Sequence, residues 1–404
     1  MDVALLLAVR LILPLSSGTP GCPGEPKVAA ICLNQQALDQ EQRGDFAAAS
    51  RKLEEADRLW ERDPGPPASL RAIILSNLGE TYEQLGRWRE ARTCFEHAIS
   101  VNTTTLGNKN VHTAYSMVRL ATIEMLLGNP AHAEELLNTA LPVERQSLPG
   151  SAVELSGALS FFSMLKLQKG EASAAEELAQ EGVEASGSLN RDSPEYAGSL
   201  TTLAGVYIVE HDLTRATPLL NRAIDILERR LGLEHPRLAP MLMDRAMIFQ
   251  GEEKTSLAEA DATRAVAILT HESGGDGINT AWAKARLSGV YLDEGKVKEA
   301  EEILPQAVER QRRFYDRPDW HVAASIGELG RLRAAQSRTG EAETLYRESL
   351  AMFDAAAPNN PEAARAMRGY ADLLRADGGS KREIRRLMAR ARSLLASTDS
   401  SRVN

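Results

Sequence analysis

Histidine and cysteine are the residues of this 404-residue sequence best suited to chemistry, because they bind metal ions and act in acid–base or nucleophilic catalysis. A zinc protease site needs two His four residues apart with Glu after the first, and a structural zinc site needs closely spaced Cys and His pairs. The seven His and three Cys show neither spacing. The cysteines, Cys22, Cys32 and Cys94, are too few for a disulfide framework in a chain of this length, and Cys94 is expected to pack inside a helix.

Phosphate-binding and hydrolase motifs are missing as well. The sequence contains no Gly-rich loop ending in Lys and Ser or Thr, and no Gly-x-Ser-x-Gly turn between a strand and a helix. Residues 273–277 are Gly-rich, but they follow a predicted helix and include no Lys. Carboxylate pairs such as Glu301 with Glu302 fall on predicted helix faces, where solvation accounts for them. We therefore predict a protein that is not an enzyme and uses no cofactor or metal ion.

The elements that carry these side chains follow from a pattern of small and apolar residues, seen most clearly in residues 75–98. A small residue in the first helix of each unit marks the register. The marks are Ala37, Gly79, Ala121, Ser163, Ala204, Ala246, Ser288, Gly330 and Ala371. Successive marks are 41 or 42 residues apart, and an Ala stands twelve residues after each of the first eight. Because two closely crossing helices require a small side chain at their contact, the pattern predicts a repeated pair of antiparallel helices.

These residues resemble the tetratricopeptide repeat (TPR) family. The 42-residue period and connectors such as LGLEHP at residues 231–236 most resemble the subfamily found in kinesin light chains and many bacterial proteins. The resemblance implies an all-α fold, a right-handed α-α superhelix of about nine helix-turn-helix repeats.

The register divides residues 23–404 into a single predicted solenoid. Its repeats are residues 30–71, 72–113, 114–155, 156–196, 197–238, 239–280, 281–322, 323–363 and 364–404. The last repeat has Glu383 in place of the recurring Ala and is rich in Arg, as expected of a polar terminal cap whose outer face meets water.

The resemblance also implies that the first helix of each repeat lines a concave groove that binds a protein or peptide partner. The predicted groove residues are Asn77, Glu80, Glu83, Tyr115, Met125, Met164, Leu167, Ile208, Met243, Met247 and Trp282. The first repeats are polar and acidic there, which favours a basic flank on the partner, and the middle repeats are apolar. Exposed apolar patches usually mark interaction sites. A tight superhelix would instead bury the same side chains against the protein itself.

The N-terminus and the net charge bear on location and partners. Residues 1–22 form a signal-like segment, an apolar run ending in Ser, Gly and Pro, although Asp2 and Arg10 depart from the usual pattern. We predict an exported or periplasmic protein, with a cytoplasmic one as the alternative. No other apolar run is long enough to span a membrane. A net charge of -9 and the lack of a clustered basic surface predict no binding to nucleic acid.

Together these features predict a non-catalytic scaffold that binds a peptide or an amphipathic helix in its groove. Two alternatives stay open. One is a regulatory, ligand-sensing TPR domain acting with a separate effector, and the other is an exported structural protein of envelope assembly.

Overall fold

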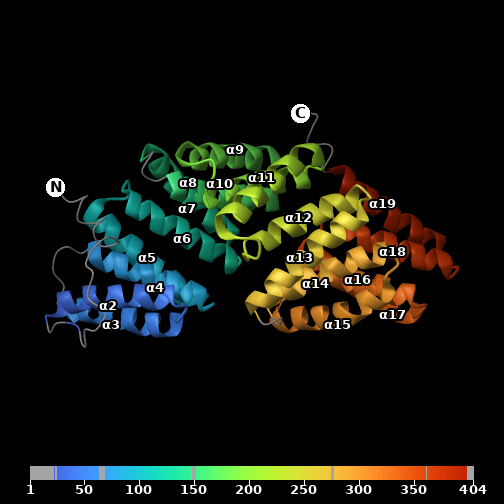
Figure 1. The fold of residues 1–404 in the computed structure, drawn as a ribbon, viewed down its shortest axis with the longest axis horizontal. Helices are drawn as coiled ribbons and strands as arrows, with labels where there is room; N and C mark the ends of the chain where they lie inside the picture. The colour runs from blue at the N-terminus through green and yellow to red at the C-terminus, as the bar shows by residue number, and fades with distance from the viewer. Residues whose placement is uncertain are drawn as a thin grey trace. The chain divides into compact units, whose positions relative to one another are not determined.

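The computed structural model describes residue 22 and residues 25–62, 69–147, 152–273, 277–315, 317–360 and 362–397. The signal-like segment, apart from Cys22, and residues 274–276 of the Gly-rich run lie outside these residues. The described residues form nine consecutive pairs of α-helices and no strand (Figure 1). The all-α fold of nine helix-turn-helix repeats is thus confirmed.

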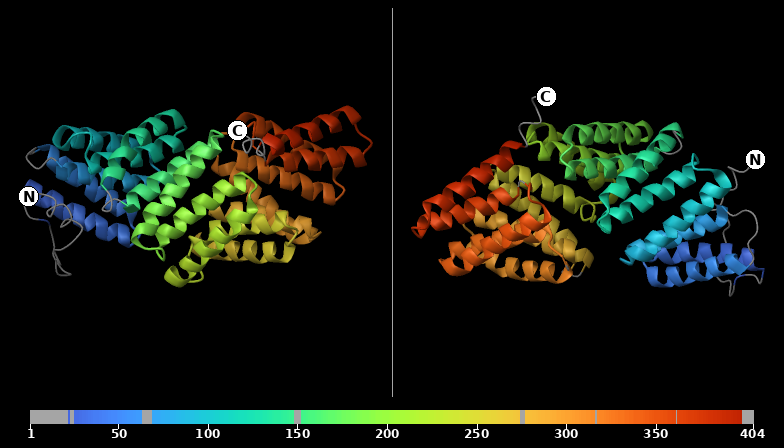
Figure 2. Two further views of the ribbon diagram at one scale, coloured as in Figure 1. Left: turned by 90° about the horizontal axis from the view of Figure 1, so that it is seen from above. Right: turned by 180° about the vertical axis from the view of Figure 1, so that it is seen from behind.

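Each pair consists of a first helix and a second helix that runs back along it (Figure 2). The pairs are α2 (Pro26–Gln42) with α3 (Phe46–Arg62), α4 (Ser69–Gln84) with α5 (Trp88–Leu106), α6 (Val111–Leu126) with α7 (Pro130–Gln146), α8 (Ala152–Gln168) with α9 (Ala172–Leu189), α10 (Pro194–Val209) with α11 (Leu213–Leu231), α12 (Leu238–Gly251) with α13 (Thr255–Ser273), α14 (Ile278–Asp293) with α15 (Val297–Phe314), α16 (Trp320–Ala335) with α17 (Thr339–Ala356), and α18 (Ala363–Ala376) with α19 (Lys381–Ser397).

The helices group into two compact units, the first ending at Ala158 and the second beginning at Leu159. The first holds α2 to α7 and the start of α8, and a cluster of buried apolar side chains joins α2 to α6. The second holds the rest of α8 and α9 to α19, around several such clusters. The single continuous solenoid over residues 23–404 stays a prediction.

The recurring Ala of the second helices lies where the pattern placed it, in the contact between the two helices of a pair. All eight are completely buried: Ala49, Ala91, Ala133, Ala175, Ala216, Ala258, Ala300 and Ala342. At the equivalent place in the last repeat, Glu383 is partly exposed and pairs with Arg386 at 2.9 Å. A charged residue thus replaces the small contact residue of the other repeats, as is typical of a polar capping repeat.

The turn between the two helices has the same backbone conformation in all nine repeats. Seven residues after each register mark, one residue has a positive φ: Gly44, Gly86, Gly128, Gly170, His211, Glu253, Gly295, Ser337 and Gly378. The amide of the following residue donates to the carbonyl five residues before it, as Arg87 does to Tyr82 at 2.8 Å. This is a Schellman-type helix end, for which Gly is best suited because it lacks a Cβ. Three repeats nevertheless use other residues there.

Two register marks are Gly because an aromatic ring fills the space where a Cβ would stand. A Cβ built on Gly79 would lie 2.8 Å from Cζ of Phe95, and one on Gly330 would lie 3.1 Å from the ring of Tyr346. Both rings are fully buried, sixteen residues after their register marks on the second helix of the pair. In the other seven repeats, Leu or Ala occupies this later position and Ala or Ser is the mark.

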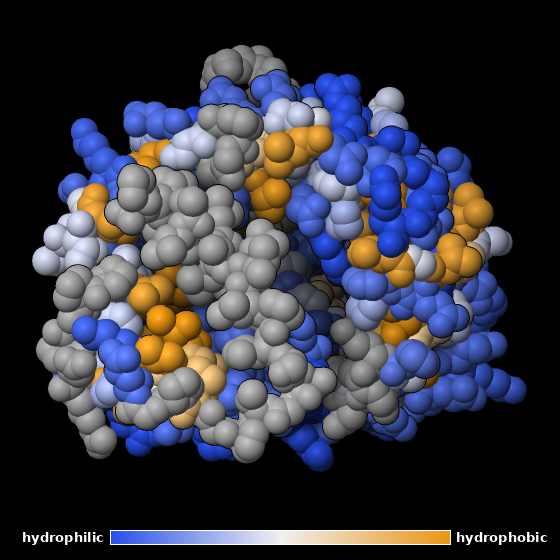
Figure 3. Space-filling model, turned by 60° about the vertical axis from the view of Figure 1, so that its left-hand side comes forward, coloured by the Kyte–Doolittle hydropathy of each residue, from blue (hydrophilic) through white to orange (hydrophobic). Residues whose placement is uncertain are grey.

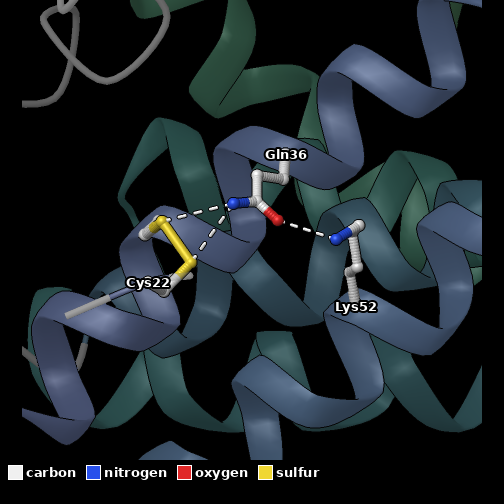
Figure 4. The surroundings of a disulfide bond; sticks show 4 residues. Cys22, Gln36 and Lys52 are labelled. Atoms are coloured by element: carbon white, nitrogen blue, oxygen red, sulfur yellow. Dashed lines mark hydrogen bonds between the residues drawn. A yellow bond between two sulfur atoms is a disulfide. The ribbon is translucent and has the colours of Figure 1, made fainter. Parts of the chain in front are cut away.

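A disulfide bond that cysteine spacing did not indicate joins Cys22 to Cys32 on α2 (Figure 4). The side-chain amide of Gln36 lies 3.4 Å and 3.6 Å from the two sulfur atoms and accepts a hydrogen bond from Lys52 of α3 at 2.7 Å. The bond thus holds the chain before α2 against that helix. Cys94 is free and buried in the core of the first unit, as predicted.

Candidate functional site

In the first unit, the predicted groove residues of α4 and α6 are bonded to one another and to their neighbours. Glu80 accepts a hydrogen bond from the hydroxyl of Tyr115 at 2.5 Å, and Glu83 pairs with Arg119 of α6. Asn77 donates to Asn34 of α2 at 2.8 Å. Burial raises the pKa of Glu83 although Arg119 opposes the rise. These polar side chains connect the first helices of successive repeats.

Met125, the remaining predicted groove residue of this unit, is half-buried at the end of α6. Exposed apolar side chains of the first unit include Val28 and Ile31 of α2. Outside the atoms drawn in grey, Figure 3 shows a mostly hydrophilic face with several apolar patches. Scattered apolar side chains of this kind are normal on a protein surface and do not by themselves indicate a partner.

In the second unit, three predicted groove residues are partly buried against the protein. Leu167, Ile208 and Met243 pack against the apolar cluster that α9 to α14 share. Met164, in contrast, is 54% exposed on α8. The apolar residues of the middle repeats are therefore divided between the interior and the surface, and whether the exposed ones bind a partner stays a prediction.

The last two predicted residues, Met247 and Trp282, line a cavity of about 280 Å³ in the second unit. The first helices of four successive repeats, α12, α14, α16 and α18, supply its walls. Small residues such as Ala285 and Gly289 leave the space open along α14. The cavity is therefore built from the helices that the family resemblance assigned to the groove.

An aromatic stack stands at the cavity. The rings of Trp320 and His321 are stacked with centroids 3.4 Å apart, and the Trp282 ring lies 3.6 Å from His321 at a tilt. Asp319 caps α16 by accepting the backbone N–H of His321 at 2.9 Å, and its Oδ1 lies 3.0 Å from Nδ1 of that side chain. Burial lowers the pKa of His321 although Asp319 opposes this. Trp320 and His321 were missed from the sequence because they begin a helix, just after a connector.

Ion pairs occupy another part of the cavity wall. Asp293 at the end of α14 pairs with Arg331 at 2.6 Å and Arg365 at 2.9 Å, and it accepts a hydrogen bond from Gln250. Glu328 pairs with the same two arginines at 2.7 Å and 2.6 Å. The two arginines hold the pKa of Asp293 below its usual value although burial opposes them. This network links α12, α14, α16 and α18 and fixes one wall of the cavity.

The described residues also bear on metal binding and on membrane crossing. They contain no group of three or more His, Cys, Asp or Glu placed to hold a metal ion. None of the helices described is both long and apolar enough to cross a membrane.

Comparison with known proteins identifies the repeats. A family model described as tetratricopeptide repeat matches residues 28–104, 70–146 and 279–355. KINESIN LIGHT CHAIN-RELATED 1 of Arabidopsis thaliana is 22% identical over 350 residues, covering 85% of this chain and 56% of that protein. KINESIN LIGHT CHAIN-RELATED 2 of the same plant is 32% identical over 102 residues, 25% of this chain and 15% of that protein. The chain thus spans about half the length of the first relative and less of the second.

Solved structures share the fold at low sequence identity. The apo form of RapI matches with a TM-score of 0.61 at 12% identity, covering 92% of this chain and 98% of RapI. A Rap protein complexed with competence and sporulation factor matches with a TM-score of 0.57 at 14% identity, covering 91% of this chain and 99% of that one. The kinship with bacterial members in particular stays a prediction. The family-model matches show that this chain contains tetratricopeptide repeats, over residues 28–146 and 279–355.

Proposed function

We propose that this protein is a non-catalytic scaffold that binds an extended peptide or an amphipathic helix along the first helices of its repeats, with the cavity of α12 to α18 as the main contact. The observation that supports this most is the position of Met247 and Trp282, two predicted groove residues that line one cavity. A large aromatic ring and a flexible thioether in one pocket suit the anchoring of a partner side chain.

The similar structures add support of a general kind. One of the Rap structures contains competence and sporulation factor, so a fold of this type carries a bound molecule there. Tetratricopeptide repeats are generally scaffolds without catalytic activity. The regulatory, ligand-sensing role remains the alternative.

The test is a peptide array probed with the full-length protein, the Met247→Glu variant and a Leu257→Glu control. Leu257 is 51% exposed on α13, the second helix of its pair, so the control introduces the same charge outside the cavity. We expect Met247→Glu, and likewise Trp282→Ala, to lose most array signals while Leu257→Glu keeps them, all three with unchanged helical circular dichroism. Equal signals for all variants would place binding outside the cavity and refute the proposal.

We also propose that the protein is exported. A disulfide persists in oxidising compartments and is rare in the cytosol, so the bond between Cys22 and Cys32 favours export. Mass spectrometry of the protein from its own cells, after alkylation without reductant, tests this. Two alkylated thiols at these positions would contradict the proposal.

A further inference from the structure

The last helix of the chain, α19, carries charges of almost one sign (Figure 1). Glu383 is its one acidic residue, and six others are basic: Lys381, Arg382, Arg385, Arg386, Arg390 and Arg392. The net charge of the helix is therefore +5. Because the net charge of the whole chain is -9, the other residues together carry -14.

Only two of these six basic side chains are paired among the described residues. Arg386 pairs with Glu383 at 2.9 Å, and Arg390 pairs with Asp354 of α17. The other acids of α17 are no substitute, because each already pairs with an arginine outside α19. Four exposed basic side chains thus form no ion pair with a described residue: Lys381, Arg382, Arg385 and Arg392.

The four unpaired side chains lie on one face of α19. At 3.6 residues per turn, their spacing places them within an arc of about 100°. The helix packs inward through another face, where Leu387, Ala391 and Leu394 are buried. The first and the last of the four lie about 16 Å apart along the helix axis. Together they form a basic stripe that is one helix wide.

A polar cap alone does not require charges of a single sign. Acidic and basic residues in alternation would also give the polar outer face that a terminal repeat needs. Instead, like charges stand four residues apart, as in Lys381 with Arg385, and such pairs destabilise a helix. Lys381 and Arg382 also begin the helix, where its dipole favours acidic residues. A bound anionic group would relieve both unfavourable effects.

The size of the basic stripe favours a short acidic segment as its partner. An extended chain covers about 16 Å with about five residues, so its carboxylates can follow the stripe. A bilayer or a nucleic acid duplex presents a wider anionic surface, and the net charge of -14 on the other residues opposes its approach.

We propose that the basic stripe of α19 binds an acidic segment of a partner protein. The arginines of the stripe can each bond a carboxylate through two N–H groups, which gives the contact geometric specificity. The stripe lies on the second helix of its pair, whereas the proposed groove is formed by first helices. It is therefore a second interaction surface, and the inference does not depend on the proposed function.

The test measures the binding of two fluorescein-labelled peptides to the full-length protein by fluorescence anisotropy, up to millimolar protein. One peptide contains a run of glutamates, and the other has glutamine in their place. We expect the glutamate peptide to bind about tenfold or more tightly at about 50 mM salt, because several exposed ion pairs add up. Its affinity should fall at about 200 mM salt, since ions screen exposed charges.

The combined variant Arg382→Gln, Arg385→Gln and Arg392→Gln should lose this preference, whereas lysine at the same three positions should keep most of it. The matched control removes the same charge elsewhere, from exposed arginines that each pair with an acid of their own helix: Arg222→Gln, Arg313→Gln and Arg375→Gln. The control should keep the preference. All variants should keep the helical circular dichroism of the parent chain.

Three results would overturn the inference. They are equal binding of the two peptides, no binding of either, and an equal loss in the stripe variant and the control. Duplex DNA or vesicles containing phosphatidylserine serve as further probes, and either one binding the stripe more tightly than the glutamate peptide would also overturn it, because the partner would then belong to another class. None of these results bears on the groove, which the peptide array with Met247→Glu tests separately.

Discussion

Replacing Gly79 by Ala tests whether the aromatic ring of the second repeat determines its register residue. The added Cβ would lie 2.8 Å from Cζ of Phe95, well inside the normal carbon–carbon contact of about 3.5 to 4.0 Å. Phe95 is completely buried, so its ring has no free space into which to move. Overpacking of this kind costs about 1 to 3 kcal/mol, whereas Ala gains about 1 kcal/mol over Gly inside a helix. We expect a net loss of about 1 kcal/mol.

Gly79→Ala should have the opposite effect on stability once the ring of Phe95 is removed. In the first repeat, Ala37 and Leu53 occupy the two equivalent positions, and both are completely buried without a clash. In a Phe95→Leu background, Gly79→Ala therefore restores a combination that the chain already uses. It should then stabilise α4 by about 1 kcal/mol, which is the helix propensity alone. The two positions are thus expected to be coupled by about 2 kcal/mol.

Hydrogen exchange followed by mass spectrometry is the suitable assay, because it reports the stability of α4 and α5 without requiring the two units to unfold together. A change of about 1.4 kcal/mol in the free energy of opening alters the exchange rate about tenfold. Gly79→Ala should speed exchange in α4 about fivefold in the parent chain and slow it about fivefold in the Phe95→Leu background. A coupling below about 0.5 kcal/mol, or slower exchange in both backgrounds, would refute the steric explanation of Gly79.

Three further predictions concern the turns, the helix contacts and a half-buried carboxylate. Glu253→Gly should stabilise the sixth repeat by about 1 kcal/mol because φ is 60° there. Gly86→Ala, at φ 71°, should destabilise the second repeat by a similar amount. A urea unfolding midpoint that shifted in the opposite direction for either variant would contradict this. Ala300→Leu should cost about 1 to 3 kcal/mol, since the side chain is completely buried between α14 and α15, and an unchanged thermal midpoint would exclude so close a contact. Burial raises the pKa of Asp244 to about 6, above its value in the unfolded chain. The stability contributed by the protonated carboxyl is therefore full below about pH 4 and is lost as the pH rises through about 6. Above that pH the carboxylate is charged, and Arg286 is the cation that acts on it. The free energy of unfolding in urea should therefore be higher for Asp244→Asn than for the parent chain by a larger margin at pH 7 than at pH 4. A margin that is the same at both pH values would show that Asp244 does not titrate abnormally.

The repeat and its helix pairs were predictable because each depends on contacts between residues at fixed spacing. Ala300 packs against the first helix of its own repeat, so one position per unit was enough to reveal the pairing. The positive φ at Gly86 follows in the same way from the turn that every pair needs. The disulfide between Cys22 and Cys32 was not predictable on these grounds, because it occurs once, at the start of the first repeat.

The cavity was only half predictable, since its chemistry depends on contacts between repeats and not within them. Arg365 bonds Asp293 across 72 residues, which is almost two repeats, and nothing in the period of 42 indicates that such a bond forms. A periodic pattern assigns residues to the inward face, but whether Glu80 is available to a partner depends on whether Tyr115 of the next repeat already bonds it. The residues that matter most for specificity are therefore those that break the repeat without finding a partner inside the protein.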